Sequence, residues 1–327
     1  MKLDKKYLAI GASAVILLLL IFIFSTVGSV DLSLKEIFSS LINNDNKVVT
    51  TIVYKMRLPR NILAAIVGAN LAIAGVLLQS VMRNPLADPG ITGVSTGASV
   101  AAIIVLLVLP KYSAMLPIVA FVGGAIACIL VFIMSYKNGL KPGRIVLAGV
   151  AINTILGGVI SFLSTMYSDR IQSAMLWLNG SLATKTWSHV NMLFIYSLIG
   201  LVASLFLIRS ANLLQLGDDA ATNLGVNVNL TRLIICTVAV FLAGISTAVV
   251  GIISFVGLIV PHIARMIMGS DHKYTIPFSI VLGAIVLLVA DTLARSIGGA
   301  LEIPVGVIMS IVGGPFFLYL LRKRGYE

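Results

Sequence analysis

RNPLADPGITGVSTGAS, residues 83–99, is a polar turn rich in glycine and proline between two apolar runs, each long enough to cross a membrane. Its two prolines donate no backbone hydrogen bond, and the remaining polar groups of a turn at a membrane surface must still find partners. We therefore expect this segment, the elbow, to be packed and ordered. The residues that we expect to shape it are Arg83, Asn84, Pro85, Asp88, Pro89 and Gly90.

The composition indicates a membrane protein. Of the 327 residues, 59% are hydrophobic and 11% are charged, which leaves too few polar residues to cover a soluble protein of this size. The first apolar run, 8–30, is longer than the core of a signal peptide and has no small-residue cleavage pattern, so it predicts an uncleaved span. Cys128 and Cys236 lie inside apolar runs and predict neither a disulfide framework nor a metal site.

Apolar runs predict an all-α polytopic membrane protein, one transmembrane domain over residues 1–327 with about ten helical spans. The runs are 8–30, 61–82, 89–110, 112–136, 145–168, 190–208, 233–250, 254–268, 275–293 and 303–321. The uncharged stretch 233–264 is too long for one helix, and we divide it at Gly251, which leaves a short eighth span containing Pro261. Their Gly and Ala residues, such as Gly68 and Gly75, predict a tight bundle.

The cationic residues favour cytoplasmic termini. With ten spans both termini lie on one side, and most Lys and Arg residues fall in the loops of that side. These loops account for the net charge of +11, so we expect membrane lipid and no nucleic acid as a partner. Five further cations crowd the first outer loop, 31–60, where orientation gives no reason for them: Lys35, Lys47, Lys55, Arg57 and Arg60.

Two hydrophilic segments are longer than simple turns. The outer one, 31–60, predicts a short surface helix over 34–41 followed by an Asn-rich turn at 43–46. The inner one, 210–231, contains LLQLGDDAATNLGV, whose apolar residues around Gly217 and Gly225 fit two short amphipathic helices along the membrane surface. An ordinary polar loop is the alternative for this inner segment.

The sequence lacks the motifs of several kinds of binding or catalytic site. The chain has no GxxxxGK[ST] phosphate-binding loop, so energy from ATP must come through a partner. His262 stands beside Pro261 in an expected helix, and we expect it to bond a carbonyl that the proline exposes rather than to bind haem or a metal. The Asp218–Asp219 pair lacks the second acidic motif that a prenyl-transfer site would need, and we do not expect an enzyme.

Seven motifs in order resemble the permease subunits of type II ATP-binding-cassette importers for ferric siderophores, haem and cobalamin, the FecCD-like family. They are RLPR (57–60), GANLAIAGVLLQSVMRNPLADPGITGVSTGAS (68–99), VLAGVAI (146–152), LGDDAATNLGV (216–226), SFVGLIVPHIAR (254–265), ADTLAR (290–295) and LEIPVGV (301–307). The resemblance covers nearly the whole chain and implies a bundle like that of the cobalamin importer permease, in a bacterial plasma membrane.

The resemblance also implies a function and partners. The chain would be the permease of an importer for an iron chelate. A ferric siderophore is the preferred cargo, and haem and cobalamin are the alternatives. It would bind no cofactor and catalyse nothing, because two cytoplasmic ATPase subunits would bind ATP and Mg. The other partners would be an extracytoplasmic solute-binding lipoprotein and a second copy of the permease or a sister permease.

By the same resemblance, three sets of residues acquire roles. Arg57, Arg60 and Arg295 match arginines that pair with glutamates on the two lobes of the binding protein, the alternative being contact with lipid headgroups. The residues that match the coupling helices, which bind the ATPase, are Leu213, Leu216, Gly217, Asp218, Asp219, Ala220, Ala221, Leu224 and Gly225. The pathway candidates, mainly on the fifth and tenth spans, are Asn153, Thr154, Gly157, Ser161, Ser164 and Ser310. The family's cytoplasmic gate has Thr or Ser where this chain has LKPGR (140–144), so no gate residue is assigned.

A different class, the ion-coupled secondary transporter, needs acidic residues in the middle of the membrane. Asp291 is the one candidate, and Arg295 lies four residues away on the same helix face. Either the two neutralise each other, or Arg295 points outward as a docking cation. The first arrangement leaves no charge to couple to an ion, so we prefer the importer.

Overall fold

The chain is all-helical. The computed structural model describes residues 3–28, 32–33, 47–137, 139–297 and 302–323. Within these residues, seven helices are long and apolar enough to cross a membrane and three shorter apolar helices join them, as the ten predicted spans require. The elements are α1 (Leu3–Ile23), α3 (Lys47–Thr50), η1 (Thr51–Arg57), α4 (Leu58–Met82), η2 (Pro89–Thr92), α5 (Val94–Ile103), η3 (Ile104–Val108), η4 (Pro110–Met115), α6 (Leu116–Ser135), α7 (Pro142–Met166), η5 (Ser168–Arg170), α8 (Ile171–Leu178), α9 (Trp187–Phe206), α10 (Ile208–Gln215), α11 (Asp218–Asn223), α12 (Val228–Val250), α13 (Val256–Met268), α14 (His272–Ile297) and α15 (Val305–Lys323).

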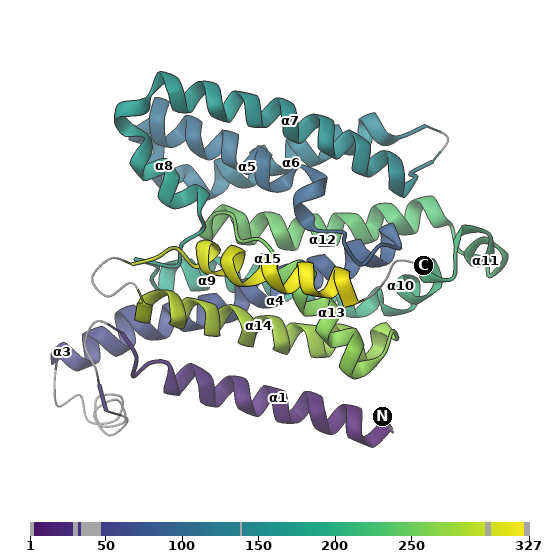
Figure 1. Cartoon of the computed structure of the whole chain (residues 1–327), viewed down its shortest axis with the longest axis horizontal. Helices are drawn as coiled ribbons and strands as arrows, with labels where there is room; N and C mark the ends of the chain where they lie inside the picture. Colours follow the sequence, from purple (N-terminus) through teal and green to yellow (C-terminus); the bar gives the residue numbers. More distant parts are fainter. Residues whose placement is uncertain (1–2, 29–31, 34–46, 138, 298–301, 324–327) are drawn as a thin grey trace.

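The helices form two groups with α12 between them (Figure 1). Helices α5, α6, α7 and α8 lie together along one side, and α1, α4, α13, α14 and α15 lie along the other. Helix α12 packs on α4 in one group and on α6 in the other. The amino end of α1, the carboxyl end of α15 and the short helices α10 and α11 lie at one end of the bundle, and α3 lies at the opposite end. This arrangement agrees with ten spans and with both termini on one side; that end is called inner below.

Helix α4 is the centre of the bundle, and glycines let it approach its neighbours. A Cβ atom on Gly68 would lie 2.2 Å from the carbonyl oxygen of Gly283 in α14, and one on Gly75 would lie 2.0 Å from that of Gly257 in α13. Only glycine fits such contacts, which hold helices together in lipid where no hydrophobic force acts between them. The tight bundle predicted from the small residues is confirmed.

The predicted division of the long apolar stretch is also confirmed. Helix α12 ends at Val250 and is capped by Gly251, whose φ of +81° suits glycine, and α13 begins at Val256. Within α13, Pro261 frees the carbonyl of Gly257, and the side chain of Gln79 donates to that carbonyl at 2.9 Å. Gln79 thus satisfies the carbonyl that the proline frees, and His262 is buried on the same helix as the proline.

The outer loop is shorter than predicted. Residues 47–82 form one helical stretch of 36 residues, about 54 Å at 1.5 Å per residue, so it extends beyond the hydrocarbon core. Residues 47–60 of the predicted outer segment are therefore helical, and whether they lie outside the membrane stays a prediction. Val49 and Val53, four residues apart, are buried together with Leu32, and this apolar contact supports the extra helix. The surface helix at 34–41 and the turn at 43–46 lie outside the described residues.

Candidate functional site

An arginine and two carboxylates meet at the outer end of the bundle. Arg60 on α4 grips Asp291 on α14 in a bidentate pair, with Nε to Oδ2 at 2.9 Å and Nη2 to Oδ1 at 3.0 Å. Its remaining nitrogen, Nη1, lies 3.0 Å from Oε2 of Glu302. The Asp291 side chain is fully buried, whereas that of Glu302 is 48% exposed. One carboxylate is therefore an internal counter-ion and the other faces the outer solution.

Two further arginines lie beside this pair. Arg57, three residues before Arg60 on the same helix face, donates to the carbonyl oxygens of Ser25 and Thr26 at 2.8 and 2.9 Å. Arg295 on α14 donates to the carbonyl of Phe24, and to the side chains of Asn61 and Thr292. Because α4 and α14 pack face to face, residues far apart in sequence meet here. We call Arg57, Arg60, Asp291, Arg295 and Glu302 the outer cluster.

This arrangement corrects the expected pairing of Asp291 with Arg295. Asp291 is paired with Arg60, and among the described residues no carboxylate lies within 4 Å of the Arg295 guanidinium. The alternative, an outward-pointing Arg295, is also not seen, since Arg295 is 6% exposed and bonded inside the protein. Residue spacing alone could not show that a third residue competes for the same carboxylate.

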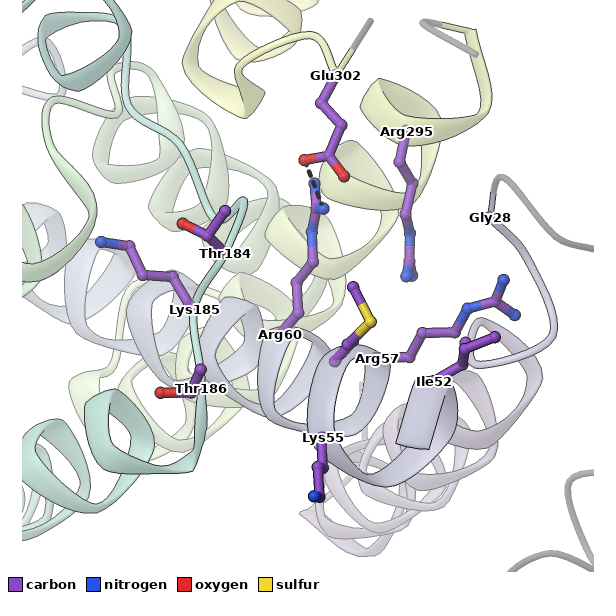
Figure 2. A pocket seen from close by; sticks show the side chains of 11 residues that line it. Gly28, Ile52, Lys55, Arg57, Arg60, Thr184, Lys185, Thr186, Arg295 and Glu302 are labelled. Atoms are coloured by element: carbon purple, nitrogen blue, oxygen red, sulfur yellow. Dashed lines mark hydrogen bonds and ion pairs between the residues drawn. The ribbon is translucent and has the colours of Figure 1, made fainter. Parts of the chain in front are cut away.

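A hollow of about 450 Å³ opens beside the outer cluster. Five cationic side chains and one carboxylate line it: Lys55, Arg57, Arg60, Lys185, Arg295 and Glu302. Figure 2 shows Lys55 and Lys185 pointing away from the arginines, and its dashed line marks the contact of Arg60, on α4, with Glu302, which precedes α15. Burial lowers the pKa of Lys185. The excess of positive charge suits a partner that presents carboxylates.

At the inner end, the two predicted amphipathic helices are present as α10 and α11. The chain reverses at Gly217, whose φ is +106°, and again at Gly225, whose φ is +80°. Leu216 and Leu224 expose about 60% of their surface to solvent, at 61% and 60%. Leu213 and Ala220 are half-buried, Ala221 is buried and Asp219 is exposed. The alternative of an ordinary polar loop is ruled out, and an apolar surface of two leucines remains uncovered.

The carboxylate of Asp218 joins these helices to the bundle. Its Oδ1 lies 2.6 Å from Nη2 of Arg232 on α12 and 3.2 Å from Nη2 of Arg83 at the start of the elbow. Sequence reasoning placed Asp218 on the coupling segment and Arg83 in the elbow but did not connect them. Residue spacing cannot reveal a contact of one carboxylate with two arginines that are distant from it and from each other in the sequence. We call Arg83, Asp218 and Arg232 the inner cluster.

The elbow is ordered, as predicted. Arg83 adopts the left-handed conformation with φ of 49°, which ends α4. The side chain of Asn84 accepts a hydrogen bond from Leu86 N at 2.9 Å, and that of Asp88 accepts one from Gly90 N at 2.8 Å. Burial raises the pKa of Asp88, against the effect of this backbone donor. Pro85 and Pro89 take positions where no amide donor is needed, with Pro89 first in η2.

The pathway candidates lie on α7 and α15. Asn153 is bonded inside the protein, donating to Gly90 O at 3.0 Å and accepting from Thr96 Oγ1 at 2.6 Å. Thr154, Ser161 and Ser310 are exposed, Ser164 is half-buried, and a Cβ atom on Gly157 would meet nothing within 4 Å. Apart from Asn153, these residues thus line open or partly open helix faces. Among the described residues, no group of three His, Cys, Asp or Glu side chains is placed to hold a metal ion.

Residues 16–323, nearly the whole chain, match the FecCD transport family. The chain belongs to this family. The FecCD relative Fe(3+)-citrate import system permease protein YfmE of Bacillus subtilis (strain 168) is 39% identical over 322 residues, covering 98% of this chain and 96% of that protein. A protein of Staphylococcus aureus (strain Newman) named "Probable heme-iron transport system permease protein IsdF" is 37% identical over 318 residues, covering 97% and 96% of the two chains.

Solved structures agree with the FecCD assignment. One described as a metal-chelate type ABC transporter in an inward-facing conformation gives a TM-score of 0.86 at 29% identity, and the match covers 97% of this chain and 99% of that one. PsaBC from Streptococcus pneumoniae in complex with Fab gives 0.57 at 17% identity over 88% and 95%, which shows a similar fold alone. This FecCD protein is a multi-pass membrane permease of a bacterial ABC importer for iron chelates, and it is not itself catalytic.

Proposed function

We propose that this permease moves a ferric siderophore from an extracytoplasmic binding protein into the cytoplasm, driven by ATP hydrolysis on two partner ATPase subunits. The observation that supports this most is that the two ends of the bundle carry two different surfaces suited to binding other proteins. The outer end has an excess of cationic side chains around a hollow, and the inner end has two exposed leucines on short helices. A conduit that works between a binding protein and a motor needs one docking surface at each end.

The binding protein docks on the outer cluster through its own carboxylates. Arg57, Arg60 and Arg295 are each less than 10% exposed, and their guanidinium groups are already held by internal acceptors. Such preorganised guanidinium groups lose little entropy when they bind a carboxylate. On Arg60, the half-exposed carboxylate of Glu302 occupies the edge that a partner carboxylate would take. Docking therefore includes an exchange of carboxylates on Arg60.

The docking proposal is tested by the affinity of the loaded binding protein for the permease in nanodiscs. Glu302→Gln removes both the competitor and a negative charge, so the affinity should rise, and it should fall as salt is added. The control is Asp169→Asn, which removes another exposed carboxylate, one that pairs with its neighbour Arg170 outside the outer cluster. An unchanged or lower affinity for Glu302→Gln would contradict docking on this cluster.

The ATPase subunits, which carry ATP and Mg, bind α10 and α11. Exposed Leu216 and Leu224 supply the apolar anchors, and Gly217 allows the sharp reversal between the helices. Leu216→Asp should abolish co-purification of the ATPase and leave binding of the solute-binding protein unchanged. Retention of the ATPase by this variant would remove the assignment.

A second permease, a copy of this chain or a sister chain, completes the pathway. Helix α7 is 25 residues long, and only 11% of its most apolar window is buried within this chain. Its open face, with Gly157 and Ser161, would then line a weakly interacting channel together with Ser310 of α15. A weakly binding wall suits a bulky chelate, which a tight site would trap. Crosslinking of two permeases through a cysteine at Ser161 tests this placement.

The cargo is decided by uptake in cells. The two relatives described above carry the names of ferric citrate and haem permeases, and both cargoes are iron held in an organic chelator. A deletion strain should fail to take up radioactive iron presented as a hydroxamate or catecholate siderophore, and the cloned gene should restore uptake. Restoration only with haem, or only with ferric citrate, would replace the siderophore by that cargo; haem is the second candidate because of the relative at 37% identity.

A further inference from the structure

The inner cluster connects a coupling helix to two parts of the bundle at once. Asp218 is the first residue of α11, and its carboxylate is shared by Arg232 and Arg83 at 2.6 and 3.2 Å. The Arg232 side chain is 2% exposed, whereas those of Arg83 and Asp218 are about 40% exposed. One contact is therefore inside the protein, and the other lies at its surface.

The first connection runs from Arg232 to the start of α7. Arg232 donates from Nη1 to the carbonyl of Leu140 at 2.9 Å, and Asn229, one turn earlier on α12, accepts from Leu140 N at 3.1 Å. Both backbone groups of Leu140 are thus held by α12. Leu140 is buried, and α7 begins two residues later, at Pro142. A shift of Arg232 is passed directly to the amino end of α7.

The second connection runs from Arg83 through the elbow to the middle of α7. The carbonyl of Gly90 in the elbow accepts from Asn153 on α7 at 3.0 Å. A Cβ atom on Gly149, one turn earlier on α7, would lie 1.8 Å from the carbonyl oxygen of Ile91, so the elbow rests against the helix backbone. The elbow and α7 have no space to move independently at this point.

The neighbouring helix α10 is attached elsewhere. Asn212 on α10 donates to Asp271 Oδ1 at 2.8 Å, and its own Oδ1 accepts from His272 N at 3.0 Å. These contacts hold α10 on the start of α14, in the other helix group of Figure 1. Helix α10 is therefore fixed to the start of α14, whereas α11 is fixed through Asp218 to α12 and to the residue that ends α4. The two short helices, joined at Gly217, thus have different attachment points on the bundle.

We propose that Asp218 is the positioning residue through which the coupling helices move α7, by way of Arg232 and Leu140 and by way of Arg83 and the elbow. This inference rests on the proposed binding of the ATPase to α10 and α11. Closure of the ATPase moves α11. The shared carboxylate passes that movement to the start of α7, through Arg232, and to the middle of α7, through Arg83 and the elbow. The residue contacts neither ATP nor cargo.

The test compares Asp218→Asn with Asp169→Asn in the complete complex of permease, ATPase subunits and binding protein in proteoliposomes. Asp169 is exposed and pairs with its neighbour Arg170 outside the inner cluster, so the control removes the same charge from a position with no part in coupling. Asp218→Asn should keep ATPase assembly and ATP hydrolysis and lower the amount of chelate transported per ATP by about tenfold or more. Asp169→Asn should leave that ratio unchanged. Arg83→Gln/Arg232→Gln should lower it as Asp218→Asn does.

A distance measurement separates transmission from folding. Spin labels at Leu147 on α7 and Met266 on α13, both exposed, should change their separation when ATP is added to the complex with wild-type Asp218. With Asp218→Asn the separation should be that of the nucleotide-free state whether or not ATP is present. A normal ATP-dependent change, a normal transport ratio, or loss of the ATPase from Asp218→Asn would overturn the role of Asp218. Failure of the wild-type permease to bind the ATPase at all would instead overturn the proposed function.

Discussion

The two carboxylates on Arg60 allow a matched test of what holds the outer end together. Asp291 is fully buried and accepts two hydrogen bonds from Arg60, so Asp291→Asn leaves the buried guanidinium with only the half-exposed Glu302 as a counter-ion. Breaking a buried pair by removing one partner costs about 3–5 kcal/mol. Glu302 is half-exposed, and the loss of such a pair costs about 0–1 kcal/mol. An unfolding entropy of about 2.1 cal/mol/K per residue gives about 1.5 °C per kcal/mol for 327 residues. The expected losses in thermal midpoint are then about 4–8 °C for Asp291→Asn and about 1.5 °C or less for Glu302→Gln.

The assay is the loss of the monodisperse peak in size-exclusion chromatography after heating the permease in one detergent. A double-mutant cycle completes the experiment. Arg60→Met leaves a buried carboxylate and should cost about as much as Asp291→Asn, whereas Arg60→Met/Asp291→Leu removes both charges and should recover most of the stability. The reasoning is refuted if Glu302→Gln is as destabilising as Asp291→Asn, or if the double variant loses the sum of the single losses.

Three further predictions concern single contacts, each measured by the same thermal assay. Gln79→Leu removes the donor to the carbonyl that the proline of α13 frees and also the acceptor for the Arg265 side chain, so it should cost about 1–3 kcal/mol or more; an unchanged midpoint would mean that other partners replace it. Gly75→Val places atoms against the α13 backbone and should cost about 1–3 kcal/mol or more, whereas Gly158→Val on the open face of α7 should cost little; equal losses would contradict the packing argument. Burial raises the pKa of Asp88, so its ionisation costs folding free energy above that pKa; Asp88→Asn keeps an acceptor for Gly90 N and should therefore raise the midpoint at about pH 7.5, an advantage that fades as the pH falls toward about 4. An advantage that grows on acidification would show the opposite sign of the shift.

The membrane spans were predictable from the sequence because a hydropathy profile shows the length of each apolar run, and the thickness of the bilayer sets the length that a spanning helix needs. The division at Gly251 was predictable since the uncharged stretch exceeded one helix, and the structure places a positive φ there. The helix over 47–57 was not predicted, because its Lys and Arg residues suggested a loop. Val49 and Val53, four residues apart, were the signal that could have revealed it.

The clusters were only partly predictable. Arg60 and Asp291 were both noted, but their pairing joins residues 231 positions apart, and spacing favours a neighbour such as Arg295. The acid in the motif LEIPVGV, Glu302, lies on the same outer side as the arginines, so a count of outer charges could have suggested it. The contact of Asp218 with Arg232 depends on how α11 folds back on α12, which no local pattern encodes.

The elbow was the most reliable local prediction, since its chemistry is contained in consecutive residues. Asp88 and Asn84 have short side chains that cap nearby backbone amides, and this is what such residues do next to proline and glycine. What the sequence did not show is that the elbow rests on α7 through Asn153 and Gly149. We had expected Asn153 to face the pathway.

The account depends on the permease being a gate whose energy comes from other subunits. The direct measurement is accumulation of a radioactive ferric chelate by proteoliposomes that contain the permease with or without the ATPase subunits, in the presence of loaded binding protein. Accumulation should require the ATPase subunits and hydrolysable ATP, and an ion gradient across vesicles with the permease alone should give none. Uptake against the chelate's own gradient by the permease alone would contradict the account.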